Sequence, residues 1–264
     1  MEATKQKRTL PLLPLALILA VGLLLGAKSI WYAWADLTFY WTERSETELM
    51  VKAYAEEQGL SIAQFPESLI QLLAQNPETK EFVLNYPFRQ EREVSYPDLR
   101  APGDVPLFLQ WDSRWGYETY GSDFLAVTGC GPTCLAMAGC YLTGDENMSP
   151  HQLARFAEKE VYYEPGYGSS WTLISEGAGD LGLTATELPL VKGKLVEALE
   201  SGCPVILAMG AGDFTSTGHY IVLTGVEDDA FRVNDPNSIE NSQRLWTYKE
   251  LEHQIRNIWK ISLS

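Results

Sequence analysis

The sequence predicts an α+β domain, because its helical patterns come first and its strand patterns come later in the chain. The helical patterns occupy residues 131–201. Short runs typical of strands follow at 204–209, 219–224 and 231–234. The chain has 264 residues, of which 45% are hydrophobic, so it is long enough to bury one good core and to carry accessory segments.

Three regions are expected along the chain: an apolar N-terminal segment at 1–36, a helical region at 37–100 and the α+β domain at 101–264. The whole chain carries a net charge of −15. Residues 1–28 contain four basic residues and one acidic residue, a charge of +3, which leaves −18 for the remainder. An acidic body repels phosphate backbones and anionic lipid surfaces, so no nucleic acid partner is expected, and solubility is the ordinary explanation of the charge.

The segment 1–36 is predicted to be a membrane anchor. An uncharged run of 18 residues extends from Leu10 to Ala27, which is long enough to cross a bilayer. Three basic residues precede it, which places the N-terminus in the cytoplasm and the body outside, and aromatic residues at 31–34 suit the outer interface. The alternative is a signal peptide cleaved near Ala35. Under both interpretations, the rest of the chain is exported from the cytoplasm.

The region 37–100 is predicted to form short helices that serve as a spacer or as a packing cap. Residues 45–48 have the spacing of a capping box, and Gly59 is suited to close that helix. Proline suits the first turn of the next two helices, and Asn76 is the expected cap of the second. The sequence assigns no chemical role to this region.

Within 101–264, a helix should begin near Gly131 or Pro132 and run through Gly139. Further helices are expected at 150–160, after a loop at 166–171, and at 192–201, and a helical pattern returns from Tyr248 to Trp259.

The stretch Thr128-Gly129-Cys130-Gly131-Pro132-Thr133-Cys134 predicts a nucleophile at a helix entrance. Proline is comfortable in the first turn, which puts Cys130 near unpaired N–H groups and the positive end of the helix. Such a position lowers a thiol pKa and favours the reactive thiolate. Glycines on both sides permit a sharp bend and a close approach of substrate. Cys134 falls a turn later and is expected to be packed inside.

The alternative for these cysteines is a structural one. An exported chain with four cysteines allows two disulfides in three connectivities. Three of the cysteines fall within one predicted helix and cannot easily pair with one another. No CxxC, HExxH or His-rich pattern is present, so neither a zinc site nor any cofactor is expected. The four are Cys130, Cys134, Cys140 and Cys203.

A nucleophilic thiol needs a base, and the chain has three histidines. His219 starts an apolar strand, so its polar ring would lie at the end of a sheet. A hairpin folded at Glu227 would bring Asp235 opposite His219, where Cβ atoms are about 5 Å apart. A slip of one or two residues would promote Asn234 instead. The remaining histidines, His151 and His253, suit surface positions.

Acyl transfer also needs donors for the developing oxyanion. The backbone N–H of Cys130 is one candidate. Gln110, which lies in an aromatic-rich loop, is a candidate for a second donor from a side chain, although its residue type alone gives it little weight.

Together these stretches resemble cysteine peptidase family thirty-nine, in its C39-like branch, which is named after leader peptidases that process double-glycine bacteriocin precursors. The matching stretches are VPLFLQWDSRWG, TGCGPTCLAMAG, GSSWTLISEGAGDLGL, GCPVILAMGAGDFTSTGHYIVLTG and VNDPNS, over about residues 104–262. The resemblance implies a papain-like fold in which Cys130 is the nucleophile, His219 the general base and acid, Asp235 its orienter and Gln110 the side-chain oxyanion donor.

The expected function is a membrane-anchored, extracytoplasmic cysteine peptidase that hydrolyses amide bonds of peptides or proteins through a thioester, with no metal or nucleotide. The alternatives are a peptidoglycan amide hydrolase acting on cell-wall peptides and a catalytically silent peptide-binding module. The leader peptidases are fused to an ABC transporter and face the cytoplasm. This chain has no Walker motif, so processing of double-glycine leaders is not implied.

Overall fold

The computed structural model describes residues 46–89, 103–145, 147–166 and 168–264. The predicted anchor at 1–36 lies outside these residues. Within the described parts of the chain, no helix combines the length and the apolar character needed to span a membrane.

The leading helical region has the short helices that its caps predict. Residues 46–57 are helical, and Gly59 follows with φ of 70°, the left-handed conformation that ends helices. Asn76 caps the turn at Pro77 as predicted, because its side chain accepts a hydrogen bond from Glu78 N at 3.0 Å. The elements are η1 (Ile62–Gln64), α2 (Glu67–Gln75), η2 (Pro77–Thr79), α3 (Lys80–Leu84) and η3 (Tyr86–Phe88).

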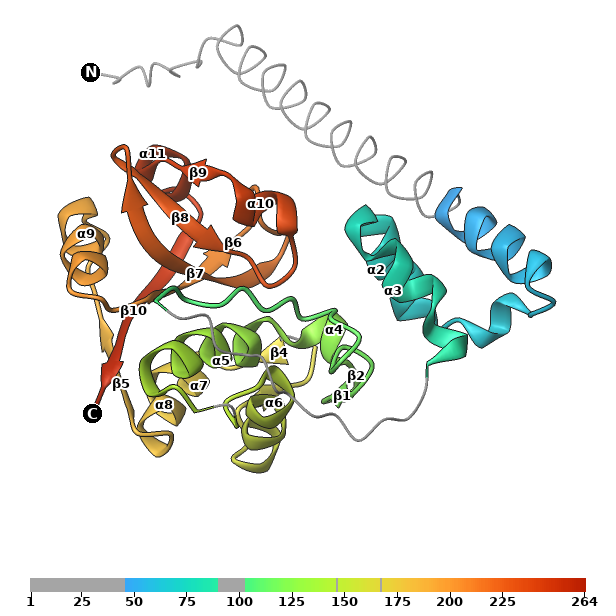
Figure 1. The fold of residues 1–264 in the computed structure, drawn as a ribbon, viewed down its shortest axis with the longest axis horizontal. Helices are drawn as coiled ribbons and strands as arrows, with labels where there is room; N and C mark the ends of the chain where they lie inside the picture. Colours follow the sequence, from blue (N-terminus) through green and yellow to red (C-terminus); the bar gives the residue numbers. More distant parts are fainter. Residues whose placement is uncertain (1–45, 90–102, 146, 167) are drawn as a thin grey trace, which may run out of the picture.

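The α+β prediction is confirmed, with helices before a six-stranded antiparallel sheet. Helices α5 to α8 gather on one side and the sheet lies on the other (Figure 1). The helices are α4 (Leu125–Thr128), α5 (Cys130–Thr143), α6 (Pro150–Lys159), α7 (Thr172–Ser175), α8 (Gly177–Asp180), α9 (Lys192–Glu200), α10 (Ile239–Gln243) and α11 (Tyr248–Leu251).

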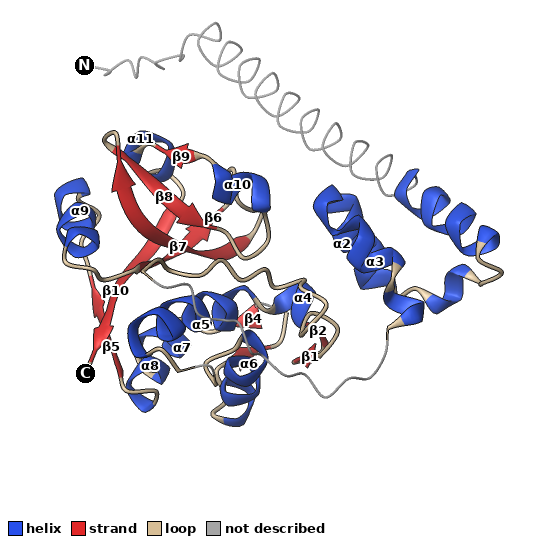
Figure 2. Cartoon of the chain, in the orientation of Figure 1, coloured by secondary structure: helices blue, strands red, loops and turns tan. Residues whose placement is uncertain are grey.

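The strands of the main sheet have the order β5-β10-β6-β7-β8-β9, and every pair is antiparallel. Two small two-stranded sheets lie among the helices (Figure 2). The main strands are β5 (Leu183–Glu187), β6 (Val205–Gly210), β7 (Gly218–Glu227), β8 (Ala230–Asn234), β9 (Leu245–Trp246) and β10 (Ile255–Leu263); the small ones are β1 (Thr119–Tyr120), β2 (Asp123–Phe124), β3 (Tyr163–Glu164) and β4 (Gly168–Ser169).

The helix expected from Tyr248 to Trp259 is wrong, because only α11 forms and β10 replaces the rest. In β10 the buried residues include Ile255, Ile258 and Trp259, spaced as on a helix. The register between β10 and β6 shifts between Ile255 and Asn257, so a bulge interrupts the alternation that would mark a strand.

Each face of the sheet has its own core because neighbouring strand residues point to opposite faces. Tyr220 and Val222 of β7 pack with α5 and α6, whereas Ile221 and Leu223 pack with α9 and with Phe231. A third cluster joins the leading helices to the α+β domain, since Phe82 and Val83 share it with Ala126 of α4 and with Trp111 and Tyr117. The leading region is therefore packed against the domain.

Candidate active site

Cys130 is the first residue of α5, and α4 ends two residues earlier at Thr128. In an unbroken helix the N–H of Cys130 would bond to the carbonyl of Ala126. Among the described residues, no backbone carbonyl accepts a hydrogen bond from that N–H. The break between α4 and α5 therefore places the thiol at a helix N-terminus beside an unpaired donor, as the sequence predicts.

All four cysteines are free thiols, so the alternative of two disulfides is not what the structure shows. Cys134 is fully buried, which confirms its predicted packing, and burial raises the pKa of its thiol well above the ordinary value. Within the described residues, no group of three or more His, Cys, Asp or Glu side chains is placed to hold a metal ion.

His219 and Asp235 form a buried pair in which His219 Nε2 lies 2.7 Å from Asp235 Oδ1. Their residues are 8% and 1% exposed. The ring nitrogen that remains for the thiol is Nδ1, since Nε2 contacts the carboxylate. Cys130 raises the pKa of the imidazole through a side-chain hydrogen bond and through its charge, so its thiol lies beside the His219 ring. The structure thus brings Cys130, His219 and Asp235, three of the four predicted residues, next to one another.

The pKa of His219 reflects two opposing effects. Burial alone would lower it, but the charge of Asp235, its hydrogen bond and the neighbouring Cys130 raise it from 6.5 to about 10. The imidazole therefore holds its proton at neutral pH.

The hairpin that carries this pair differs in register from the one expected. Its turn is centred on Asp228 and Asp229, both with positive φ, rather than on Glu227. The ladder pairs Val222 with Asn234 and shifts between Leu223 and Gly225, so Asp235 is not directly opposite His219. Diagonal neighbours on one face remain within reach of a long side chain, which is how the contact forms.

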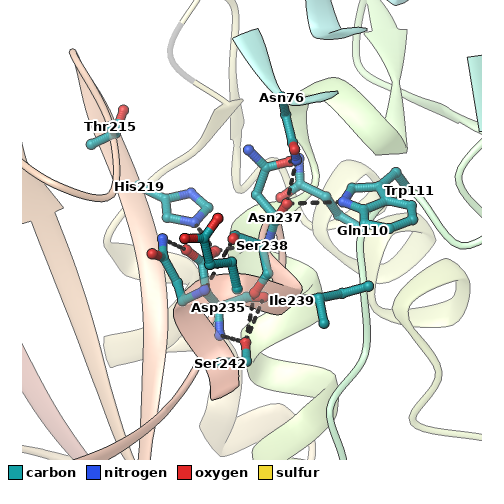
Figure 3. A network of polar contacts seen from close by, with 12 residues as sticks. Asn76, Gln110, Trp111, Thr215, His219, Asp235, Asn237, Ser238, Ile239 and Ser242 are labelled. Carbon is teal, nitrogen blue, oxygen red and sulfur yellow. Dashed lines mark hydrogen bonds and ion pairs between the residues drawn. The ribbon is translucent and has the colours of Figure 1, made fainter. Parts of the chain in front are cut away.

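Asn234 points elsewhere, because its amide donates to the carbonyls of Val105 and Pro106 at 3.1 and 3.0 Å. Asp235 is therefore the residue that meets His219. Its carboxylate has two further donors: Asn237 N to Oδ1 and Asn241 Nδ2 to Oδ2, both at 2.8 Å (Figure 3).

Gln110 is 3% exposed, and its Nε2 donates to the carbonyl of Ala126 at 2.7 Å. That carbonyl is the one which the N–H of Cys130 would bond in a continuous helix. The amide of Gln110 and the N–H of Cys130 are thus gathered at the same break between α4 and α5. The amide has a second hydrogen that this contact does not use.

The C39-like family model, described as "Peptidase_C39 like family", matches residues 103–262, and this range contains the whole constellation. The chain belongs to the Peptidase C39-like family. No curated protein sequence matches it significantly.

Two solved peptidase domains are similar to this C39-like chain. The peptidase domain of Streptococcus ComA, a bi-functional ABC transporter involved in quorum sensing, is 19% identical; the match covers 52% of this chain and 91% of that one, with a TM-score of 0.39. A double glycine motif protease from an AMS/PCAT transporter, solved in complex with the leader peptide, is 17% identical; the match covers 50% and 83%, with a TM-score of 0.30.

The glycines around Cys130 in this C39-like domain also permit close packing, which the sequence did not predict. A Cβ at Gly129 would lie 2.4 Å from the carbonyl oxygen of Leu125, and one at Gly131 would lie 2.5 Å from Ser169 Oγ. Neither φ is positive, so the backbone conformation does not require glycine. Close packing of α4 and β4 around the N-terminus of α5 requires it instead.

The other two histidines are not part of the site of this C39-like domain. The His253 side chain is 77% exposed, and His151 lies in the first turn of α6. The sequence did not predict that Asn241 donates to the Asp235 carboxylate. Asn241 is a polar residue six positions after Asp235, and no general rule connects that spacing with a contact to a carboxylate.

Proposed function

We propose that this C39-like domain is a cysteine peptidase that cleaves an amide bond of a peptide through a thioester on Cys130. The observation that carries the proposal is the proximity of Cys130, at the N-terminus of α5, to the buried His219–Asp235 pair. Family membership supports the same reaction.

Before the reaction, His219 already carries the proton of the Cys130 thiol. In the first half of the reaction, the Cys130 thiolate attacks the carbonyl carbon of the substrate. The negative charge moves to the carbonyl oxygen, where the N–H of Cys130 and the amide of Gln110 are the proposed donors. The C–N bond then breaks, and the amine leaves with the proton held on His219. The acyl group remains on sulfur as a thioester.

In the second half, His219 removes a proton from water while the water oxygen attacks the thioester carbon. The C–S bond breaks, the acid product leaves, and the proton on His219 balances the thiolate of Cys130. Asp235 keeps the ring in the required tautomer and stabilises the imidazolium. The charges balance without a metal or a nucleotide.

Alkylation of the full-length protein in detergent with iodoacetamide at neutral pH tests this function. We expect rapid labelling of one cysteine, loss of that label in Cys130→Ala, and labelling slowed at least about tenfold in His219→Ala, because thiolate formation depends on the imidazole. Cys203→Ala is the matched control and should label as the wild type does. If Cys130 labels no faster than an ordinary thiol, the proposed mechanism is wrong.

The substrate class is measured by digestion of a peptide library beside purified cell-wall fragments. Cleavage of library peptides supports the peptidase. Cleavage of wall fragments alone supports the peptidoglycan amide hydrolase, and rapid labelling without any cleavage supports the peptide-binding module.

The location that we propose is extracytoplasmic, with the run from Leu10 to Ala27 as an uncleaved anchor, on the strength of its length and of the basic residues before it. We expect the protein purified from membranes to retain its N-terminal segment by intact mass. A mature chain that begins near Ala35 would instead indicate a cleaved signal peptide and overturn the anchor.

A further inference from the structure

The leading helical region reaches the loop that carries Asp235. The carboxylate of Glu78, in η2, accepts hydrogen bonds from Ser238 Oγ at 2.6 Å, from Ile239 N at 2.7 Å and from Glu240 N at 3.3 Å. These groups lie at the start of α10, three to five residues after Asp235. Glu78 therefore binds the N-terminal end of the short helix that follows the Asp235 loop.

Asn76 holds the same loop one residue earlier. Its Nδ2 donates to the carbonyl of Asn237 at 2.5 Å, and Trp111 Nε1 donates to that carbonyl at 2.9 Å (Figure 3). Asn76 is 8% exposed, and its own Oδ1 accepts from Glu78 N at 3.0 Å. The side chain of Asn76 thus also caps the turn between α2 and α3 that carries Glu78.

Hydrogen bonds connect the residues that Asn76 and Glu78 contact to the carboxylate of Asp235, either directly or through one further residue. Asn237, whose carbonyl Asn76 binds, donates its N–H to Asp235 Oδ1. Ser238, which Glu78 binds, caps α10 by accepting from Asn241 N at 3.1 Å, and Asn241 Nδ2 donates to Asp235 Oδ2. Asp235 Oδ1 therefore accepts from a residue that the leading region contacts directly, and Oδ2 accepts from one that it contacts through Ser238.

We propose that Asn76 and Glu78 are positioning residues of the active site, and that the region 46–89 is a working part of the peptidase rather than a spacer. The proposal deepens the proposed function and rests on it. The two side chains act through Asp235 and do not touch the reacting atoms. A displacement of about 1 Å at a catalytic group costs rate, so the loop needs this second support.

The titration of His219 provides a direct readout. The charged and titratable groups that act on its ring are Asp235, from the loop after β8, and Cys130, from α5. Loosening the loop weakens the contact with Asp235, and the pKa of His219 then falls toward its ordinary value. Because the chain has three histidines, selective ¹³C labelling of histidine gives three NMR signals, and His219→Ala assigns the relevant one.

The experiment compares full-length wild type in detergent with Glu78→Ala, Glu78→Gln and Asn76→Asp. Glu78→Ala should lower the pKa of His219 by about one unit and slow alkylation of Cys130 about tenfold. Glu78→Gln keeps the shape and one acceptor oxygen, so a smaller shift is expected. Asn76→Asp keeps the shape but loses the amide donor. Glu81→Gln is the matched control, because Glu81 is an exposed acid in α3 and should change neither quantity.

The outcomes separate this inference from the proposed function. A shifted His219 titration in a protein whose Cys130 is not activated supports the positioning role and overturns the peptidase. Suppose instead that Cys130 is activated, and that its alkylation rate and the pKa of His219 are the same in all three variants as in the wild type. That result overturns the positioning role alone. If Glu78→Ala fails to fold, the two variants of unchanged shape still decide the question.

Discussion

Asp235→Ala should lower kcat for peptide cleavage roughly 10⁴-fold, the scale observed when the orienting acid of a catalytic triad is removed. Alanine leaves His219 Nε2 without its 2.7 Å partner, inside a site where both residues are almost fully buried. The imidazolium then loses the carboxylate charge beside it, and the neutral ring loses the partner that fixes its tautomer. Steady-state kinetics on a cleavable library peptide measure the loss, and a melting curve confirms that the variant is folded.

Asp235→Asn is the informative companion. The amide oxygen can still accept from His219, but the negative charge is gone, so a loss of rate of the same order as with alanine is expected. Activity requires the proton on His219, so the basic limb of the pH–rate profile should move to lower pH. A basic limb unchanged from wild type would contradict the assigned role of Asp235.

The same pair makes stability depend on pH. The folded pKa of His219, about 10, lies above its ordinary value of 6.5. Its stabilising contribution is therefore complete below about pH 6.5 and is lost as pH rises toward about 10. This fall in stability across that window should be largely absent in Asp235→Asn.

Gln110→Ala should lower kcat about 10²- to 10³-fold, the usual cost of removing one oxyanion donor. The rate of alkylation of Cys130 by iodoacetamide should stay near the wild-type value, because displacement of iodide creates no oxyanion. The two measurements together separate a donor to the transition state from a residue that merely supports the break between α4 and α5.

Gln110→Glu is the control of nearly equal shape, and as a carboxylate it has no N–H to donate. It should lose turnover as alanine does. Equal losses of turnover and of alkylation in both variants would show that Gln110 acts through its 2.7 Å bond to Ala126, and the assigned oxyanion role would then be wrong.

The residues that meet at the candidate site were predictable from local signals. Proline and glycine around Cys130 mark a helix entrance, and a histidine at the start of an apolar strand marks the end of a sheet. The register of the hairpin was not predictable, because the shift near Thr224 and the turn at Asp228 leave no clear pattern of polarity.

The parts that the sequence did not reveal are non-local. Residues 255–263 carry a helix-like spacing of buried residues only because a bulge interrupts the strand. The contacts of Asn76 and Glu78 join residues about 160 positions apart, and no spacing rule connects such positions. Only the folded chain shows that the leading helices reach the loop that carries Asp235.

The position of β10 has a consequence for biogenesis. It is the last of the described strands in sequence order, yet it lies between β5 and β6 and is bonded to both. Strand β6 therefore has one bare edge until residues 255–263 have left the ribosome. Contacts between distant segments form slowly, so the sheet that supports His219 depends on this late pairing. A bare strand edge can pair with another chain, so β10 also covers an edge at which β6 would otherwise invite association between molecules.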